Sequence, residues 1–301
     1  MLVVFARGVD DESMPQHVVD AHLHLWDLNH PWYPGLQAFA EDVGKPDLYS
    51  DFGLDDYAAA AGGFPVEQYV HVSAVTAPRA YLDELRWVSK VAADRGVDMR
   101  FVGSVDPTLS AQDICADLDA QAAITPEFRG VRVLYGFEPD SQAARTVLRW
   151  LDDHDLVFDL TAHPETMDGW LRTLADFPNL SVVLEHTGWP TATDTEAWTA
   201  WRRAITTCAE KTSASCKISG LGMTTGVLSA ETLRPWVEPV VDAFGWDRVI
   251  FGSNIPIEHI GGRYVDLVDS LNTIIGDEPA DEQDRFYRRN ALGVYGFGQE
   301  R

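Results

Sequence analysis

The sequence predicts an α/β protein of the (β/α)8 TIM-barrel class, and three observations lead to this class. Strand-like apolar runs alternate with helix-like runs eight times along the chain. Most of these apolar runs are continuous, as is typical of parallel strands that are buried on both faces. Eight such units in about 280 residues fit a closed barrel better than a doubly wound sheet. The doubly wound sheet stays the alternative, although no glycine-rich nucleotide fingerprint follows the first strand.

The elements can be placed in order from these runs. The predicted strands cover residues 18–24, 67–75, 100–107, 130–136, 156–163, 180–187, 215–221 and 248–254. The predicted helices cover residues 78–95, 111–123, 141–153, 165–176, 195–210, 230–244, 263–276 and 280–291. Residues 29–53 are rich in proline, glycine and aromatic residues. We therefore expect a structured excursion beside the functional site there, rather than a linker.

The chain of 301 residues is long enough for one barrel-sized domain, which we place at residues 17–301. We expect residues 1–16 to form a flexible N-terminal extension. Residues 1–6 are apolar, but they are too few for a signal sequence or a membrane span. Three cysteines without C-x-x-C spacing exclude a disulfide framework and a zinc ribbon, so we expect a cytoplasmic protein.

The charge of the chain limits its partners. There are 23 basic and 47 acidic residues, which give a net charge of −24. Such a surface repels the phosphate backbone of nucleic acid and anionic membranes, so we expect neither as a partner. The partner class that remains is a small-molecule substrate, and a homo-oligomer is compatible with the sequence.

The stretch VVDAHLHLWD, residues 18–27, ends the first predicted strand with two histidines. In a regular strand the side chains alternate, which predicts that Asp20, His22 and His24 lie on one face. Two imidazoles at positions i and i+2 can bind one metal ion. An isolated pair of this kind is also common as two ordinary histidines near a sheet edge.

Other predicted strands end in polar residues as well, and active sites of barrels lie at this end of the strands. These residues are Arg132 and Tyr135, His163, Glu185 and His186, Lys217, and Ser253 and Asn254. With the pair on the first strand, four of the nine histidines lie at strand ends. This concentration predicts a functional site there.

These segments resemble the amidohydrolase superfamily. The H-x-H on strand one, the histidines on strands five and six and the polar residue on strand eight follow its pattern. The segments DAHLHLWD, GVRVL, LEHTGWP, CKISGL and RVIFGSN are similar to its amidohydrolase-2 branch, which includes sugar lactonases and 2-pyrone-4,6-dicarboxylate lactonase. The resemblance covers about residues 17–297 and implies a metal-dependent hydrolase on a TIM barrel.

The resemblance implies one divalent metal ion, zinc or manganese, with a metal-free site as the alternative. The implied ligands are His22, His24, His163 and Asn254, and the implied catalytic residues are His186, Asn254 and His163. Many superfamily members carry a bridging lysine or carboxylate where this chain has Arg132. Because arginine cannot bridge two metal ions, the site is predicted to be mononuclear.

Four residues are predicted to contact the substrate. The charges of Arg132 and Lys217 suit a carboxylate or a polarised carbonyl, and an ion pair with a neighbouring acidic residue is the alternative for each. Trp26 and Trp189 lie in loops next to the strand ends, where an aromatic face suits a substrate ring. Packing within the loops is the alternative for both.

Asn254 departs from the pattern of the branch. Hydrolytic members typically have an aspartate there, which ligates the metal and accepts a proton from the attacking water. An amide is no base at neutral pH. Asp20, Glu185 or Glu258 would then serve as the base, or water activated by the metal would attack unaided. We expect the variant Asn254→Asp to retain activity.

The function predicted from the sequence is the hydrolysis of a lactone, either a sugar lactone or a pyrone-type cyclic ester. One alternative is a metal-dependent decarboxylase of an aromatic or unsaturated acid, in which Arg132 and Lys217 would hold the carboxylate. A degenerate, non-catalytic homologue is another, because Asn254 replaces the usual aspartate. Hydrolysis of an amide or another C–N bond is the fourth.

Overall fold

The computed structural model describes residues 15–298, and its strands form one parallel sheet in chain order. The strands are β1 (Val18–Leu23), β2 (Val66–Val72), β3 (Asp98–Gly103), β4 (Phe128–Arg132), β5 (Val157–Leu160), β6 (Ser181–Leu184), β7 (Ser215–Ile218) and β8 (Val249–Phe251). Residues after β8 return to β1: the Asn254 amide donates to the His22 carbonyl at 2.7 Å, and the His24 amide to the Ile255 carbonyl at 2.9 Å. The sheet therefore forms a nearly closed barrel, which confirms the predicted fold.

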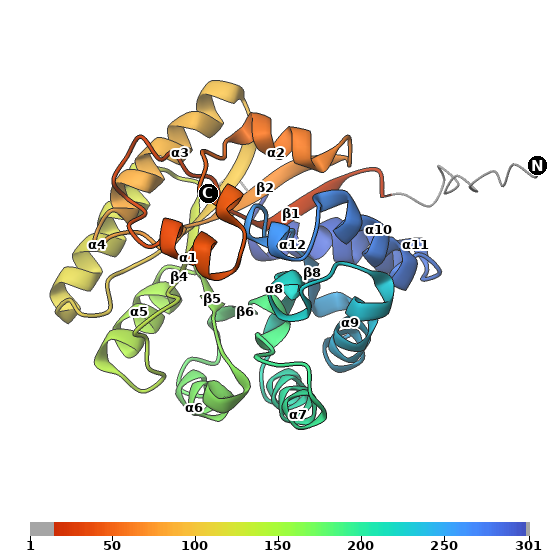
Figure 1. Ribbon diagram of the computed structural model, residues 1–301. Coiled ribbons are helices and arrows are strands. Elements are labelled where there is room, and N and C mark those ends of the chain that lie inside the picture. The colour runs from red at the N-terminus through yellow and green to blue at the C-terminus, as the bar shows by residue number, and fades with distance from the viewer. Residues whose placement is uncertain (1–14, 299–301) are drawn as a thin grey trace, which may run out of the picture.

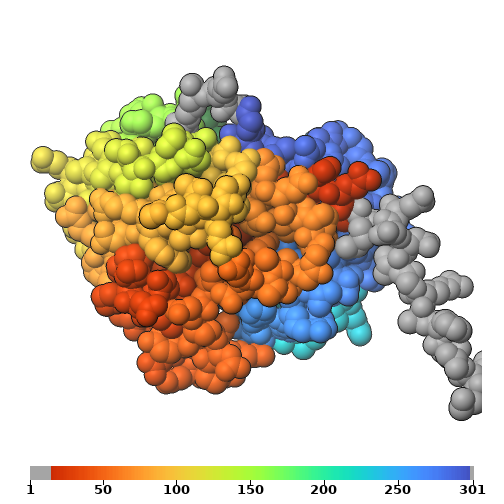
Figure 2. All heavy atoms as spheres, turned by 90° about the horizontal axis from the view of Figure 1, so that it is seen from above, coloured from red at the N-terminus to blue at the C-terminus, as the bar shows by residue number. Residues whose placement is uncertain are grey.

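Helices alternate with the strands and surround them (Figure 1). The longer ones are α2 (Leu54–Ala61), α3 (Tyr81–Arg95), α4 (Ala111–Ile124), α5 (Gln142–Asp153), α6 (Pro164–Leu174), α7 (Thr195–Lys211), α9 (Ala230–Phe244) and α10 (Tyr264–Ile275). Shorter segments are α1 (Leu36–Asp42), α8 (Leu221–Thr225), α11 (Ala280–Asp284), the π-helix η6 (Arg285–Arg289) and α12 (Asn290–Val294). Short 3-10 turns are η2 (Pro46–Leu48), η3 (His186–Gly188), η4 (Trp246–Arg248) and η5 (Ile257–Ile260). Orange residues of the first part of the chain meet blue residues of the last part, as closure requires (Figure 2).

Side-chain caps explain why several helices begin where the sequence predicts. Ser110 accepts from the Asp113 amide before α4, Ser141 from the Ala144 amide before α5, and Asp194 from the Glu196 and Ala197 amides before α7. Each cap satisfies a backbone donor that the first helical turn leaves free. The predicted bounds of these helices lie within one residue of the observed ones.

The segment after β1 contains more helix than we predicted. The excursion of residues 29–53 includes α1 and η2, and α2 follows it directly. Helix α2 begins where the Asp56 carboxylate accepts from the Gly53 amide at 2.8 Å, and it buries Tyr57 and Ala61. In a segment rich in proline and glycine, helices this short show no recognisable helical periodicity.

The barrel interior is filled by small apolar side chains and closed at one end. The side chains of this interior cluster come from the strands and from the C-terminal segment after η6: Val19, Ala21, Val70, Val72, Val102, Val157, Val183, Ile250, Ala291, Tyr295 and Phe297. A larger apolar cluster packs the outer faces of the strands against the helices. The C-terminal segment therefore covers one end of the barrel and leaves the carboxyl ends of the strands accessible.

A bulge in β1 changes which side chains face the interior. Asp20 pairs with Tyr69 and Leu23 with His71, so two residues of β1 oppose one residue of β2. As a result, Ala21 and His22 both face the interior, and Asp20 faces the helices, where it accepts from the Tyr57 hydroxyl at 2.6 Å. The prediction that Asp20 shares a face with the two histidines is wrong, because it assumed unbroken alternation.

Two further observations concern the chain as a whole. The predicted N-terminal extension, residues 1–16, lies outside the described residues except for Pro15 and Gln16. No described helix has the length and apolar character needed to cross a membrane.

Candidate active site

A cavity of about 290 Å³ opens at the carboxyl ends of the strands. Its floor carries four polar side chains: His24, Arg132, His186 and Asn254. Its walls come from the segment 26–39, the loops after β2 and β4, and residues near η3, α8 and η5. The volume lies at the lower end of the range for small-molecule sites.

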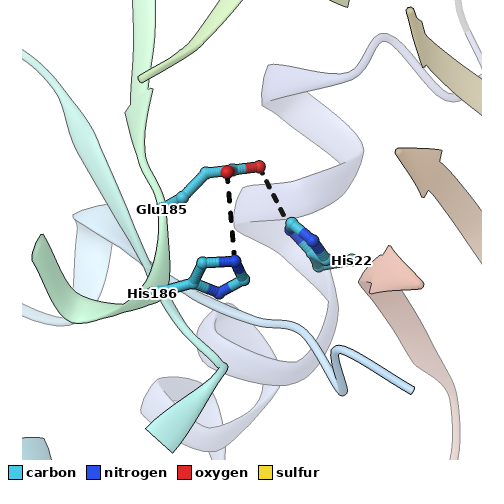
Figure 3. Close-up of side chains that lie close together, drawn as sticks. All are labelled: His22, Glu185 and His186. Atoms are coloured by element: carbon cyan, nitrogen blue, oxygen red, sulfur yellow. Dashed lines mark ion pairs between the residues drawn. The ribbon is translucent and has the colours of Figure 1, made fainter. Parts of the chain in front are cut away.

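Three side chains form a cluster at this floor: His186 lines the cavity, and His22 and Glu185 lie beneath it (Figure 3). His22 Nδ1 lies 3.2 Å from Glu185 Oε1, and His186 Nε2 lies 3.9 Å from Glu185 Oε2. One potential ligand atom from each of the three lies within 4.8 Å of the others, and all three side chains are buried. Among residues 15–298 this is the one group of three histidine, cysteine or acidic side chains so placed.

Burial determines the protonation states of this group. It lowers the pKa of His22 and of His24 well below the usual value, and that of His186 to about 3. Burial opposes ionisation of Glu185, but its interaction with His22 and the charge of Arg132 hold the pKa of this carboxyl well below its usual range. At neutral pH the site consequently contains neutral imidazoles and a carboxylate.

The hydrogen bonds of His24 and His22 leave a lone pair without a partner. His24 Nδ1 contacts the Val72 carbonyl at 2.7 Å, and because a carbonyl only accepts, the proton lies on this nitrogen. His24 Nε2 then presents a lone pair to His22 Nε2, 3.4 Å away. If His22 carries its proton on Nδ1, two lone pairs face each other. If it carries the proton on Nε2, a lone pair faces the Glu185 carboxylate.

A cation that accepts both lone pairs would resolve this conflict. His22 Nδ1 and Glu185 Oε1 are buried and have no hydrogen-bond partner in the structure. Two nitrogen ligands at about 2.0–2.1 Å from a tetrahedral zinc ion lie roughly 3.4 Å apart, which matches the separation of the two Nε2 atoms. The residues present therefore fit a divalent metal ion.

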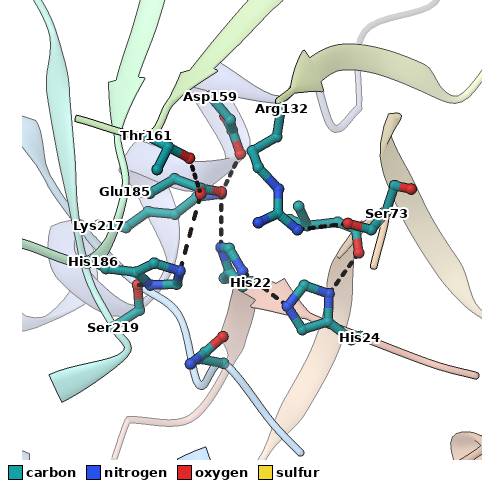
Figure 4. A network of polar contacts seen from close by, with 12 residues as sticks. His22, His24, Ser73, Arg132, Asp159, Thr161, Glu185, His186, Lys217 and Ser219 are labelled. Atoms are coloured by element: carbon teal, nitrogen blue, oxygen red, sulfur yellow. Dashed lines mark hydrogen bonds and ion pairs between the residues drawn. The ribbon is translucent and has the colours of Figure 1, made fainter. Parts of the chain in front are cut away.

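Residues at other strand ends hold these side chains in place (Figure 4). The Thr161 hydroxyl donates to Glu185 Oε2 at 3.2 Å, His186 Nδ1 lies 2.9 Å from Ser219 Oγ, and Arg132 Nη2 donates to the Ser73 carbonyl at 2.6 Å. The sequence analysis missed Ser73, Thr161 and Ser219. Each follows the last residue of its strand directly, which is the signal that could have identified them.

His163 does not join the cluster, contrary to its predicted role as ligand and catalytic residue. It lies three residues after β5 and begins α6 as the N-cap residue, where the strand no longer aims side chains into the barrel. Its ring packs against Trp189 at 5.4 Å, and its Nδ1 has no hydrogen-bond partner among the described residues. The inward positions of β5 are those of Asp159 and Thr161, and Glu185 takes the place we had assigned to His163.

Lys217 does not line the cavity, and this differs from its predicted contact with substrate. Its ammonium forms an ion pair with Asp159, and both side chains are fully buried. The Tyr295 hydroxyl donates to the other oxygen of Asp159 at 2.8 Å. The pair lies within the barrel below the site, so the predicted alternative, an ion pair with a neighbouring acid, applies.

Asn254 lines the cavity together with His24 and His186. Its backbone is left-handed, with φ of 57°, which asparagine tolerates better than most residues. Its side-chain nitrogen donates to Glu258 Oε2 at 3.3 Å, and Glu258 Oε1 accepts from the Gly222 amide at 2.7 Å. Burial raises the pKa of Glu258 to about 7. Of the three predicted bases, Glu185 and Glu258 lie at the site, whereas Asp20 faces the helices.

Two glycines leave the space that the histidines occupy. A Cβ atom on Gly252 would lie 2.8 Å from the His22 Cβ, and one on Gly220 would lie 2.5 Å from His186 Nδ1. His186 itself lies in a left-handed turn with Thr187 and Trp189, at φ values of 50°, 54° and 45°. Such a run of non-glycine residues is rare and is typical of functional sites.

Both predicted tryptophans line the cavity. Trp26 is anchored by its indole nitrogen, which donates to the Ser50 carbonyl at 2.6 Å. The ring of Trp189 meets the His186 ring edge to face at 4.7 Å. Their contact with a substrate stays a prediction, as does that of Arg132.

Comparisons with known proteins agree with this architecture. The sequence model of the family described as Amidohydrolase matches residues 19–297. An uncharacterized protein of Sinorhizobium fredii is 29% identical over 92% of this chain and 98% of its own length. An L-fucono-1,5-lactonase of Burkholderia ambifaria is 28% identical over 82% of this chain and 83% of its own length.

Solved structures share the fold at lower identity. An amidohydrolase from Burkholderia multivorans with bound zinc has a TM-score of 0.78 at 21% identity, covering 93% of this chain and 99% of its own. A 2,6-dihydroxybenzoate decarboxylase has a TM-score of 0.63 at 15% identity, covering 94% and 99%. At these identities the likeness concerns the fold alone.

Proposed function

Because this chain belongs to the amidohydrolase family, we propose that it is a hydrolase that opens a lactone at the buried cluster of His22, Glu185 and His186. The observation that carries the proposal is the cluster of two histidines and one glutamate at the bottom of an open cavity. The similarity to L-fucono-1,5-lactonases favours a cyclic ester over other hydrolysable bonds.

His22, His24 and Glu185 would hold one divalent ion, zinc or manganese, which leaves His186 Nε2 available to carry a proton. When bound, the ion supplies Lewis-acid polarisation of the ester carbonyl. The zinc in a relative of the same fold and the lone-pair conflict at His22 both support this assignment.

The reaction requires a group that moves protons. Water adds to the acyl carbon, the bond from this carbon to the ring oxygen breaks, and the ring oxygen takes a proton that the water gives up. The carboxylic acid formed then ionises and releases a second proton. His186 reaches the cavity and can carry the transferred proton, because the Glu185 carboxylate beside it stabilises the imidazolium.

Arg132 contributes charge to the same floor. Its guanidinium is buried, points at the site from β4 and is positioned by the Ser73 carbonyl. A fixed positive charge there stabilises the negative charge that develops on the carbonyl oxygen. The cationic floor also favours a second candidate function, decarboxylation, in which Arg132 would hold the carboxylate of the substrate.

A proton-release assay separates these two functions. We expect the protein loaded with zinc or manganese to release acid from at least one lactone in a panel, with kcat/KM on the order of 10⁴ M⁻¹ s⁻¹. The panel contains aldonolactones, a pyrone dicarboxylate, alkyl lactones and aryl lactones. If no lactone releases acid and a carboxylated aromatic releases carbon dioxide, the lactonase proposal is wrong and the decarboxylase takes its place.

A further inference from the structure

The walls of the cavity above the cluster are almost entirely apolar. They consist of Trp26, Leu36, Phe39, Leu134, Met223 and Ile257, together with smaller neighbours. Leu36 and Phe39 lie three residues apart on α1, so both can face the cavity from one side of this helix. At the mouth, Val75 and Tyr135 are 47% and 68% exposed, so the apolar surface extends to the entrance.

The polar atoms of two wall aromatics interact with the protein itself. The Trp26 indole nitrogen donates to the Ser50 carbonyl, and the buried Tyr33 hydroxyl faces the Glu84 carboxyl. These two rings consequently offer a bound molecule apolar surface rather than hydrogen bonds.

The polar side chains are confined to the floor, and each already has a partner. His24 is bonded to the Val72 carbonyl, His186 to Ser219, Arg132 to the Ser73 carbonyl and Asn254 to Glu258. The floor can therefore bind one polar group of a substrate, which is the ester to be cleaved. Apart from its tyrosines and tryptophans, the described lining of the walls consists of apolar side chains and glycine, which offer no side-chain hydrogen bonds to hydroxyls spread around a ring.

We propose that the substrate is an apolar lactone, a cyclic ester that carries an alkyl or aryl group, and that sugar lactones are poor substrates. This rests on the proposed lactonase function and specifies its substrate class. The ester contacts the polar floor, and the alkyl or aryl group lies between α1 and the loops after β2 and β4. A hydroxyl pressed against these walls would lose its hydrogen bonds to water without replacement, at a cost of about tenfold in binding or more.

The test compares lactones of both kinds by proton release with the zinc-loaded protein. The apolar probes are δ-decalactone and dihydrocoumarin, and the hydroxylated probes are L-fucono-1,5-lactone and D-glucono-1,5-lactone. Each kcat/KM is divided by the rate of the same lactone with hydroxide, so that ring reactivity does not decide the comparison. We expect the corrected value to be at least tenfold higher for the apolar probes.

A matched pair of variants tests the wall directly. Val75 lines the cavity and Val227 does not, and their exposed fractions are similar, 47% and 51%. We expect Val75→Asn to raise KM for δ-decalactone about three- to tenfold, because the polar amide replaces apolar contact surface. Val227→Asn should leave KM unchanged.

The outcomes of these experiments separate the apolar substrate class from the lactonase function. Corrected rates for the sugar lactones that equal or exceed those of the apolar probes would overturn the apolar substrate class and leave the lactonase function intact. Equal KM values for the two asparagine variants would also overturn it. Absence of turnover with every lactone would contradict the lactonase function itself.

Discussion

Asn254 stands where the resemblance described above implies an aspartate, and its neighbour Glu258 explains how the amide is accommodated. The side-chain nitrogen of Asn254 donates to a carboxylate that is fully buried and bonded to the Gly222 amide. An aspartate at position 254 would place two carboxyl groups in contact, and they repel each other once both are ionised. The amide and Glu258 therefore form a matched pair.

We predict that Asn254→Asp lowers the free energy of unfolding of the metal-free protein by about 1–3 kcal/mol at pH 8, because a hydrogen bond is replaced by repulsion between buried charges. Adding Glu258→Gln should recover most of the loss, since the glutamine amide can donate to the new carboxylate. Urea denaturation of the two variants and of Glu258→Gln alone provides the measurement. Equal stability of Asn254→Asp and the natural protein would show that the pair does not matter.

The metal-loaded Asn254→Asp variant should retain activity, as we expected from the sequence, because a carboxylate oxygen at this position can also ligate a divalent ion. Initial rates on the preferred lactone provide this readout. Complete loss in a folded variant would indicate that the amide itself has a specific role.

Glu84 is a second buried carboxyl, and it supports the loop that carries Val75. It accepts from the Ala74 amide at 3.1 Å and from the Ser73 hydroxyl, and burial raises its pKa to about 7. The folded protein thus binds this proton more tightly than the unfolded chain does, for which the reference pKa is 4.5. The stabilisation is complete below about pH 4.5 and is lost as the pH rises through 7.

We predict that Glu84→Gln removes this dependence. The difference in unfolding free energy between the natural protein and the variant should change by about 3 kcal/mol between pH 4 and pH 8, with the natural protein losing stability as the pH rises. Urea denaturation at a series of pH values measures it. Parallel pH profiles of the two proteins would contradict the prediction.

At the residue scale, the sequence identified the four polar side chains on the floor of the cavity but not the cluster that one of them forms with His22 and Glu185. His24, Arg132, His186 and Asn254 were all predicted from their places at strand ends, and all line the floor. His163 and Lys217 do not, because an apolar run does not reveal where a strand stops or which charge is already paired. Glu185, which the sequence offered only as one of three possible bases, is a member of the central cluster.

At the scale of elements, the bulge in β1 is what brings His22 and His24 into the barrel. Val19 and Ala21 face inward before the bulge, and the two histidines face inward after it. Strand periodicity alone predicted Asp20 on the wrong face. The pattern of apolar residues does not reveal the extra residue that a bulge adds to one strand. The helices were predicted more closely, since their caps are local signals.

The end of β8 packs against the same part of β1. We predict that Gly252→Ala displaces His22 and reduces kcat/KM at least about 100-fold, because the new Cβ would lie 2.8 Å from the His22 Cβ. Gly293→Ala in α12 is the matched control, since a Cβ there meets nothing within 4 Å. Circular dichroism establishes that both variants are folded. Undiminished activity of Gly252→Ala would contradict the close packing of these strands.

At the scale of the whole molecule, eight regular repeats made the barrel predictable from the sequence. The C-terminal segment closes one end, so the polar strand ends and the excursion after β1 meet at the other. The least predictable parts were the two walls of the cavity, which are α1 and the loops after β2 and β4. Their conformations depend on contacts with distant residues, such as the bond from Trp26 to Ser50.

The buried cluster of His22, Glu185 and His186 is the proposed hydrolytic centre. Its most direct test is the rate of proton release from the preferred lactone by zinc-loaded His22→Ala, with His17→Ala as control. His17 is 53% exposed and pairs with Glu67 away from the cluster, so its variant should match the natural protein. His22→Ala should bind no stoichiometric metal and lose at least about 100-fold in kcat/KM. Full activity of His22→Ala would contradict the account.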